Sequence, residues 1–373
     1  MGKIKVGILG ATGMVGRTYI SLLQNHPWFE VSYVAASKRS AGKKYAEAVE
    51  GRWHNSAVSG MGNRITSDLH IKHPIPASVK NLVVQPVSAV EEAKKQCSFV
   101  FSALDSETAK EFEEKYAAAG MPVVSNASAN RHTKDVPMII PEINPEHADI
   151  IKVQQKNRKW KRGFIAVKPN CSLQSYMAPL FALHKNFGVK QVIVTTMQAI
   201  SGGGHSSFDT IDIEDNVIPF IGGEEEKSER EPLKIFGKIK GSEIVYSSVP
   251  AISAHCNRVP VMDGHMACIS VKFEKKPTMN QVIEAWKSFR GVPQQLQLPS
   301  APKQPIIYNP EEDRPQTRYD RDNGKGMAVT VGRLRECNVL DYRFVGLSHN
   351  MIRGAAGGSI LTAELLKARG LIG

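Results

Sequence analysis

The apolar residues in the first part of the chain fall into short runs that alternate with amphipathic stretches. Buried strands are predicted where these runs are almost continuous, at residues 3–9, 30–36, 97–104 and 122–125. Helices are predicted from residue 14 to about residue 24 and from residue 106 to about residue 119, where Gly120 ends the second helix. Strands that alternate with helices are typical of a doubly wound parallel sheet.

The second part of the chain has a different pattern, in which β-branched strands follow one another with few helices between them. Strands are predicted at 189–199, 245–252, 266–273, 328–334 and 342–347. The charged run 224–231 is typical of a helix whose residues are mostly solvated, and residues 350–368 are Gly-rich and then helical. This part therefore predicts a long mixed or antiparallel sheet in a catalytic and subunit-contact domain.

Between the two parts, the segment Lys168-Pro169-Asn170-Cys171 joins a short apolar run, 164–167, to a helical pattern. The run is a predicted strand, and the helix is predicted to begin at Asn170, a good N-cap residue. Cys171 would lie in the first turn, where backbone N–H groups and the macrodipole favour an anion and lower the pKa of a thiol. Pro179 is expected to kink this helix. Cys171 is thus a candidate thiolate nucleophile, and the alternative is a small buried cysteine that only packs.

A glycine-rich turn follows the first strand, with Gly10, Gly13 and Gly16 spaced three residues apart. In this strand–turn–helix context the glycines predict a dinucleotide site, because they let the backbone approach a pyrophosphate at a helix N-terminus. The second strand ends in Ser37-Lys38-Arg39-Ser40, where an NAD enzyme usually carries an acid. These hydroxyls and cations suit a 2′-phosphate, so NADP is inferred, and the alternative is a basic surface turn.

Other polar residues lie where ligands are expected. The carboxyl ends of the parallel strands point to Ser102 and to the segment 126–128 with Arg131. The glycine-rich segment 201–205 lacks the ending of a P-loop and is predicted to be a flexible loop that allows close backbone approach. His265 shares the alternation of the apolar residues after it and should face inward, which for a lone histidine is more often a structural position.

The formal charge of +12 leaves two readings, a nucleic-acid binder or an enzyme for anionic substrates and phosphorylated cofactors. Much of the excess lies in the basic run 152–162, which is predicted to be an exposed loop, and no nucleic-acid-binding signature accompanies it. The five cysteines form no CxxC pair, so neither a metal site nor a disulfide framework is expected. With no signal peptide and no membrane-length apolar run, a cytoplasmic location is expected.

Together these motifs resemble the aspartate-semialdehyde dehydrogenase family, in its archaeal and fungal branch. The motifs that carry the resemblance span nearly the whole chain in the family's order: residues 10–16, residues 168–172, Gln198 with residues 201–205, Arg258 followed seven positions later by His265, and residues 354–357. The basic run looks like a branch-specific insertion. Two relatives with similar thiol chemistry remain alternatives, N-acetyl-glutamyl-phosphate reductase and malonyl-CoA reductase, although neither would need an acidic partner for a substrate ammonium.

The resemblance implies reversible, phosphate-dependent oxidation of L-aspartate 4-semialdehyde to 4-aspartyl phosphate with NADP. The biosynthetic direction is reductive and leads to lysine, threonine, methionine and isoleucine. In that direction Cys171 would attack the acyl phosphate and form a thioester. His265, with an ordinary pKa near 6.5, would be the general acid and base, and Gln198 would orient the acyl group.

The resemblance also implies the residues that bind ligands. Arg258 would bind the substrate carboxylate and Glu224 its ammonium, with the choice within residues 224–226 being the least certain assignment. Lys227, Arg131 and Asn170 would bind phosphate. The cofactor would be lined by Gly10, Thr12, Gly13, Met14, Val15, Gly16, Ser37, Arg39, Ser40, Ser102, Ala103, Ser201, Gly202 and Asn350.

The predicted architecture is α/β, with an N-terminal Rossmann-type doubly wound parallel sheet and an α+β catalytic and dimerisation domain that contains a mixed sheet. We expect the NADP-binding domain to span residues 1–168 and to be completed by the C-terminal segment 350–373, which leaves 169–349 for the second domain. A homodimer or homotetramer is expected, with small-molecule substrates and without a nucleic-acid or membrane partner.

Overall fold

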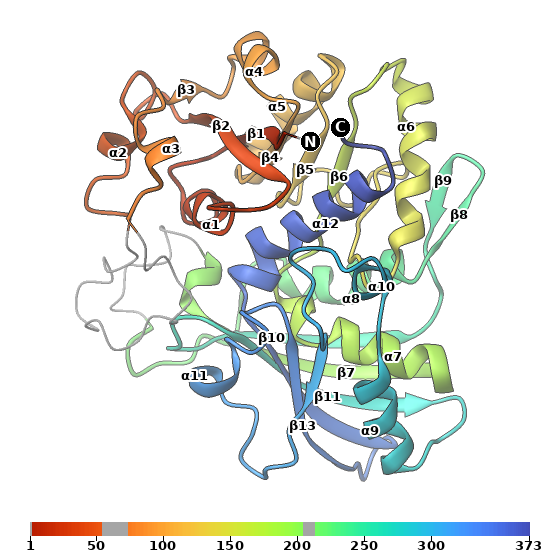
Figure 1. Cartoon of the computed structure of the whole chain (residues 1–373). Helices are drawn as coiled ribbons and strands as arrows, with labels where there is room; N and C mark the ends of the chain where they lie inside the picture. The colour runs from red at the N-terminus through yellow and green to blue at the C-terminus, as the bar shows by residue number, and fades with distance from the viewer. Residues whose placement is uncertain (1, 54–73, 204–212) are drawn as a thin grey trace.

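The computed structural model describes residues 2–53, 74–203 and 213–373, which form two six-stranded sheets with helices packed around them (Figure 1). The first sheet is parallel throughout and has the strand order β3-β2-β1-β4-β5-β6. Its strands are β1 Ile4–Leu9, β2 Phe29–Ala36, β3 Gln85–Pro86, β4 Phe99–Ser102, β5 Val123–Ser125 and β6 Ile165–Val167. This is the order of a doubly wound dinucleotide-binding sheet, so the predicted first architecture is confirmed.

The helices of this half form where the sequence provides caps and breaks. Asp105 caps α5 Ser106–Ala118 by accepting from the Thr108 N–H at 2.9 Å, and Gly120 follows the helix with a φ of +89°. The other helices here are α1 Met14–Leu22, α2 Tyr45–Ala48, α3 Ala77–Lys80, α4 Val90–Gln96 and α6 Ile151–Arg158, with the 3₁₀ helix η3 at Pro145–Ile150.

The second sheet is mixed, as predicted, with the order β10-β7-β11-β14-β13-β12. Its strands are β7 Val189–Gln198, β10 Ala251–Arg258, β11 His265–Phe273, β12 Ile306–Tyr308, β13 Val329–Glu336 and β14 Tyr342–Ser348, and β8 Lys238–Lys240 pairs with β9 Glu243–Val245. Its helical elements are η4 Ser172–Ser175, α7 Met177–Phe187, η5 Ile200–Gly203, α8 Glu224–Ile235, α9 Met279–Ser288, α10 Val292–Gln295, α11 Thr317–Asp320, the π-helical turn η8 Ile352–Ala356 and α12 Gly357–Ala368.

The register of the mixed sheet brings three polar residues to one end of its covered face. β10 runs parallel to β7, so that Arg258 pairs with Gln198 where both strands end, and β11 runs antiparallel and begins there with His265. All three lie in phase with residues such as Val194 and Ile269, which are buried in the same core as α7 and α9. The sheet therefore positions Gln198, Arg258 and His265 together.

The C-terminal helix α12 lies between the two sheets and packs against α1 and β5 of the first half (Figure 1). Ten consecutive residues of this helix, from Gly357 to Leu366, are buried, with Leu361, Leu365 and Leu366 almost inaccessible to solvent. This contact supports the predicted return of the chain to the first domain, and the boundaries at residues 168 and 349 stay a prediction. Within the described residues, no helix is both long and apolar enough to cross a membrane.

Two local predictions are wrong. The predicted strand 245–252 is split, because residues 246–250, which include Pro250, separate β9 from β10, and β10 then continues to Arg258. The basic run 152–162 was predicted to be a loop but is mostly the helix α6. On the inward face of α6, the Gln154 side chain accepts from the Ile165 N–H at 2.7 Å and donates to the Ile165 C=O at 2.9 Å, which attaches the helix to β6.

Candidate active site

Cys171 lies in the loop that follows β6, where its sulfur faces His265 at the start of β11. The distance between Cys171 Sγ and His265 Nε2 is 3.4 Å. The helix predicted to begin at Asn170 is divided into η4 and α7, with Tyr176 non-helical between them. The division has a physical reason, because Pro179 cannot donate a hydrogen bond and would clash with the Ser175 carbonyl in a continuous helix. Pro179 instead lies in the first turn of α7, where its missing N–H is tolerated.

Asn170 lies one residue before Cys171, the N-cap of η4, and connects this segment to α8. Its Oδ1 accepts from the Ser172 N–H at 2.8 Å, while its Nδ2 donates to Glu224 Oε1 at 2.8 Å. Gln198 Nε2 donates to the other oxygen, Glu224 Oε2, at 3.1 Å, and Lys227 Nζ donates to Oε1 at 2.8 Å. Of the three glutamates at 224–226, Glu224 is therefore the one that faces the predicted site residues.

Five of the eight residues in the charged run 224–231 are partly or fully exposed, as expected, but one face of the helix is buried. The side chains of α8 that repeat with helical spacing, namely Glu224, Ser228 and Glu231, are buried. On its other side, Glu225 accepts from the Cys256 N–H and Glu229 from the Ala254 N–H, each at 3.1 Å. Glu225 and Glu229 are one helical turn apart, and the N–H groups that they accept from are two residues apart on the edge strand β10. These two hydrogen bonds fix α8 beside the sheet.

Arg258 and Gly202 complete the wall beside His265. Arg258 donates to the Ala199 carbonyl at 2.8 Å. A Cβ atom on Gly202 would lie 2.8 Å from His265 Cε1 and 3.2 Å from Arg258 Nη1, so a side chain at this position would displace both groups. The predicted close backbone approach therefore holds at Gly202, whereas Gly204 and His205 of the same motif lie outside the described residues.

The environment of His265 differs from the expectation of an ordinary pKa. Burial, with the nearby Arg258 guanidinium, lowers the pKa of His265 to about 3, so its imidazole is neutral at physiological pH. Its Nδ1 accepts a hydrogen bond from the Ala199 N–H at 3.0 Å. A neutral imidazole whose Nδ1 is an acceptor carries its proton on Nε2, so His265 presents an N–H to the sulfur of Cys171.

The thiol of Cys171 also departs from the predicted direction. Its buried surroundings raise the pKa above the ordinary value, the Glu224 carboxylate adds to this effect, and the cations Lys168, Arg131 and Arg258 oppose it. Lys168 was not predicted as a site residue. It is 2% exposed, and burial lowers its own pKa to about 7.

The motif at residues 354–357 has a packing role in this site. A Cβ atom on Gly354 would lie 3.0 Å from Cys171 Cβ, and one on Gly358 would lie 2.7 Å from Lys168 Cε. Both glycines belong to the C-terminal segment that returns across the nucleophile. Their missing side chains allow the loop that carries Cys171 to lie directly against this segment.

The predicted cofactor turn has the shape that a dinucleotide requires. Gly10 has a φ of +77°, and a Cβ there would lie 2.5 Å from the Ala103 carbonyl oxygen, while a Cβ on Gly16 would lie 2.2 Å from the Gly10 carbonyl oxygen. Gly13 occupies the N-cap of α1 without a side-chain hydrogen bond to the helix, which leaves the helix N-terminus open to a phosphate. These residues fit a bound pyrophosphate.

The other predicted cofactor residues lie at the edges of this turn or nearer the nucleophile. Ser37 and Arg39 are exposed after β2, and Ser40 is buried and donates its N–H to the Ser37 carbonyl at 2.9 Å. Asn350 connects the loop before His265 to η5, since it accepts from the Gly264 N–H and donates to Ser201 Oγ, both at 2.8 Å. Of the remaining members, Thr12 lies in the turn after β1, Met14 and Val15 begin α1, and Ser102 and Ala103 lie at the end of β4.

Arg131 and the unpredicted Glu231 lie one layer below the nucleophile. Arg131 is 7% exposed and bonds Glu231 Oε1 at 2.9 Å, so it is not part of the cluster around Glu224. Glu231 could have been found from the sequence, because it lies seven residues after Glu224 and therefore on the same face of a helix. The solvated-face interpretation of the charged run hid this signal.

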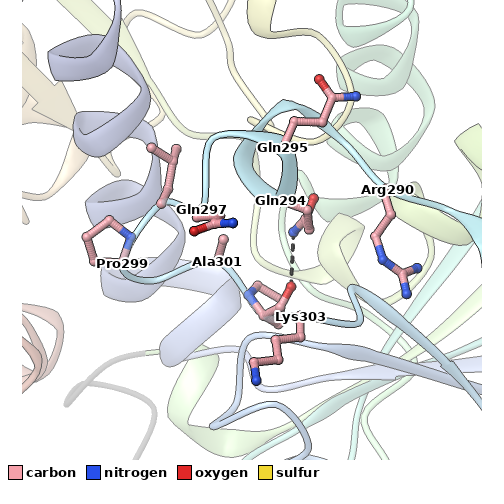
Figure 2. Close-up of a pocket in the computed structure, with 9 residues that line it drawn as sticks. Arg290, Gln294, Gln295, Gln297, Pro299, Ala301 and Lys303 are labelled. Carbon is pink, nitrogen blue, oxygen red and sulfur yellow. Dashed lines mark hydrogen bonds between the residues drawn. The ribbon is translucent and has the colours of Figure 1, made fainter.

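Two larger hollows lie away from Cys171. Figure 2 shows one of about 650 Å³, lined by residues including Arg290, Gln294, Gln295 and Lys303, in which Gln294 Nε2 donates to the Pro302 carbonyl at 3.2 Å. A neighbouring cavity of about 670 Å³ is lined in part by His26 and Ile360. No cysteine lines either cavity, so a molecule bound in one of them would not reach the sulfur of Cys171.

Comparisons with known proteins show the family to which the chain belongs. Family models match residues 5–151 as a semialdehyde dehydrogenase NAD binding domain and residues 180–353 as a semialdehyde dehydrogenase dimerisation domain. The chain is 43% identical to the aspartate-semialdehyde dehydrogenase of Archaeoglobus fulgidus, with 98% of each chain covered. It is 42% identical to that of Saccharomyces cerevisiae, with 100% of each chain covered.

The solved structures that resemble this chain are also aspartate semialdehyde dehydrogenases. The structure of aspartate semialdehyde dehydrogenase with NADP from Candida albicans has a TM-score of 0.86 at 41% identity, covering 99% of this chain and 100% of that one. A second structure, of aspartate semialdehyde dehydrogenase II from Vibrio cholerae, has a TM-score of 0.75 at 24% identity, with 99% of each chain covered, and therefore shares the fold.

The glycine contact can be tested by Gly354→Ala. The added methyl group would push the Cys171 loop away, and because a displacement of about 1 Å can lower a rate roughly a hundredfold, we expect kcat to fall at least about tenfold. Gly2→Ala is the control, since a Cβ at Gly2 meets no atom within 4 Å. Steady-state kinetics of both variants measure the effect, and unchanged turnover in Gly354→Ala would contradict the packing role.

The charges around Cys171 predict how its alkylation by iodoacetamide depends on pH. The rate should show no inflection near pH 6.5, because His265 is neutral above a pKa of about 3. Lys168→Met should slow alkylation below about pH 7, where the Lys168 ammonium is charged and lowers the pKa of Cys171, and the two profiles should converge at higher pH. Lys152→Met, at an exposed position of α6, is the control. Parallel profiles over the whole range would rule out the influence of Lys168.

Proposed function

Because this chain belongs to the aspartate-semialdehyde dehydrogenase family, we propose that the cluster around Cys171 is its active site and carries the family's reaction. That reaction is the reversible, NADP-dependent reductive dephosphorylation of L-4-aspartyl phosphate to L-aspartate 4-semialdehyde, a step in lysine, threonine, methionine and isoleucine biosynthesis. The observation that carries the assignment of the site is the 3.4 Å contact between Cys171 Sγ and His265 Nε2.

Cys171 is the proposed nucleophile. Its thiolate attacks the acyl carbon of the aspartyl phosphate, phosphate leaves with the bonding electron pair, and a thioester forms. When bound, the reduced cofactor supplies the hydride for the thioester carbon. The sulfur then leaves as a thiolate and the aldehyde is released. A thiolate suits both halves of the sequence, because it attacks well and leaves well.

His265 acts in this proposal from its neutral form. The Ala199 N–H occupies Nδ1, so the Nε2–H can donate to the Cys171 thiolate before attack and to the oxygen that gathers negative charge at the acyl carbon afterwards. An imidazolium would place a second N–H against the Ala199 N–H. This role replaces the expected histidine with a pKa near 6.5.

The charged groups around the nucleophile match the ends of an aspartyl substrate. The Arg258 guanidinium suits the α-carboxylate, and the buried Glu224 carboxylate suits the α-ammonium. Gln198, hydrogen-bonded to Glu224, is placed to orient the acyl group. An ammonium beside Glu224 would also offset the carboxylate that raises the pKa of Cys171, so substrate binding would favour the thiolate.

Lys227 and Asn170 are the proposed phosphate ligands. Lys227 is part-exposed beside Glu224, and Asn170 precedes the nucleophile with its amide group in the same cluster. Arg131 is the third proposed phosphate ligand, and its guanidinium donates to Lys168, Glu231 and Asn126 beside this cluster.

NADP would be held by the turn Gly10, Gly13 and Gly16, with Ser37, Arg39 and Ser40 toward the 2′-phosphate. The open N-terminus of α1 and the close backbone contacts of these glycines support this placement. We place the enzyme in the cytoplasm, since its five cysteines are all free, as a reducing compartment would keep them.

The open face of the mixed sheet is the proposed subunit contact. Residues that alternate with the buried ones, such as Ile193, Ser253 and Cys268, point away from α7 and α9 and are exposed. Ile193 is 44% exposed at the centre of this face, where apolar surface would be covered by a second copy. This arrangement gives a homodimer, from which a homotetramer of two dimers could be built.

The assigned reaction is tested by absorbance at the nicotinamide band with L-aspartate semialdehyde, phosphate and NADP. The wild type should reduce NADP in a phosphate-dependent manner, and Cys171→Ser should abolish this, because an alcohol is a poor nucleophile and a poor leaving group here. Cys337→Ser, at a part-exposed cysteine between β13 and β14, is the matched control and should stay active. Activity with malonyl-CoA and NADPH, without activity toward the semialdehyde, would reject the assignment.

The subunit contact is tested by Ile193→Asp and light scattering. A buried carboxylate would destabilise the interface, so the mass should shift from dimer or tetramer toward monomer. Val339→Asp, at a position that is 81% exposed on the turn between β13 and β14, should leave the mass unchanged. An unchanged mass in Ile193→Asp would mean that the copies meet at another surface.

A further inference from the structure

A buried carboxylate that the proposed reaction does not use lies behind the segment that carries Arg131. This group is Glu113 on α5, whose exposed fraction is 0%. Other charged residues of the same helix lie in solvent, where Glu111 and Lys115 form an exposed ion pair. Burying a carboxylate is costly unless it is hydrogen-bonded, so the partners of Glu113 indicate its role.

Each oxygen of Glu113 bonds one end of the segment that links β5 to Arg131. Oε1 accepts from the Ser125 hydroxyl, and Oε2 accepts from Asn130 Nδ2 at 2.9 Å. The Ser125 Oγ in turn accepts from the Ala127 N–H at 3.0 Å. Burial raises the pKa of Glu113, and these donors, together with the charge of Arg131, oppose the rise. One carboxylate therefore closes the segment between the end of β5 and the residue before Arg131.

A second set of bonds lies one residue further along at each end of this segment. Arg131 Nη2 donates to the Asn126 carbonyl at 2.8 Å. The Asn126 side chain donates to the Tyr19 hydroxyl on α1 and accepts from the Ser359 hydroxyl on α12 at 3.1 Å. The loop 125–131 is thus attached to α5, α1 and α12, and Glu113 supplies its charged anchor.

Arg131 keeps hydrogen-bonding capacity for a ligand. Its guanidinium donates to the Lys168 carbonyl, to Glu231 and to the Asn126 carbonyl, and a guanidinium has more N–H donors than these bonds use. Because its donors form a rigid fork, the phosphate contacts depend on where the loop places the group.

We propose that Glu113 is a positioning residue that sets the affinity for phosphate by holding the loop 125–131, and with it the Arg131 guanidinium. This inference rests on the proposed role of Arg131 as a phosphate ligand. The hydrogen bonds of Glu113 go to this loop and not to the loop that carries Cys171. Phosphate binding should therefore depend on Glu113, whereas thioester formation should not.

The test compares two steps of the oxidative reaction in Glu113→Gln, which keeps the side-chain volume but replaces an acceptor oxygen with a donor. The KM for inorganic phosphate in the steady state should rise at least about tenfold, because the guanidinium loses its fixed position. The single-turnover burst of NADPH from L-aspartate semialdehyde and NADP without phosphate should stay within about threefold of the wild type. In this burst the Cys171 thiolate adds to the aldehyde, hydride passes to NADP, and a thioester remains. Glu111→Gln, on the exposed side of α5, is the matched control.

The double variant Glu113→Gln with Asn130→Asp separates positioning from folding. The carboxylate and the amide exchange places, so the hydrogen bond between the two positions is restored with donor and acceptor reversed, and the cluster keeps its charge. The KM for phosphate should return to within about threefold of the wild type. Asn130→Asp alone places two carboxylates together and should weaken phosphate binding at least as much as Glu113→Gln does.

Two results would overturn the proposal. The first is a wild-type KM for phosphate in Glu113→Gln. The second is a burst rate and a phosphate affinity that fall together and do not recover in the double variant, which would limit Glu113 to folding. Wild-type turnover that does not depend on phosphate would instead reject the proposed function. In that case hydrogen–deuterium exchange of the peptide 125–131 still tests the hold, because Glu113→Gln must raise this exchange and an unchanged exchange would reject it.

Discussion

The structure depends on holding a short loop rigid where two sheets meet. Cys171 comes from the end of the first sheet, while His265, Gln198 and Arg258 come from one end of the second. Charged side chains on α8 hold these parts together, because the carboxylates of this helix form hydrogen bonds with the loop, with the edge strand and with neighbouring cations. Such charges are unfavourable alone and persist because each one is fully hydrogen-bonded. A single helix therefore sets both the substrate-binding and the nucleophilic groups.

Burial has a second consequence, which concerns protonation. It lowers the pKa of His265 to about 3 and raises the pKa of Cys171, so the free enzyme does not contain a preformed thiolate–imidazolium pair. The neutral histidine instead offers a fixed N–H, oriented by the Ala199 amide. The surrounding cations and the ammonium of the substrate would then favour the thiolate form of Cys171. This arrangement protects the sulfur when no substrate is present.

Much of the fold follows from local patterns, because period and turn chemistry act over a few residues. Five strands of the first sheet, the glycine turn and the inward phase of His265 were predicted, whereas the two-residue strand β3 was not. The predictions failed where long-range packing overrides local preference. Lys168 looks like an ordinary surface charge in the sequence, and only the fold shows that it is buried. Glu231 was missed because the charged run was interpreted as a solvated face. Likewise, the helical nature of 151–158 depends on the contact between Gln154 and β6.

The central claim is that chemistry passes through a thioester on Cys171. The most direct measurement is peptide mass spectrometry after incubation with L-aspartate semialdehyde and NADP in the absence of phosphate. The account predicts an aspartyl adduct on the Cys171 peptide that disappears when phosphate is added. NADPH formation without an adduct at Cys171, or with an adduct on one of the other four cysteines, would contradict it.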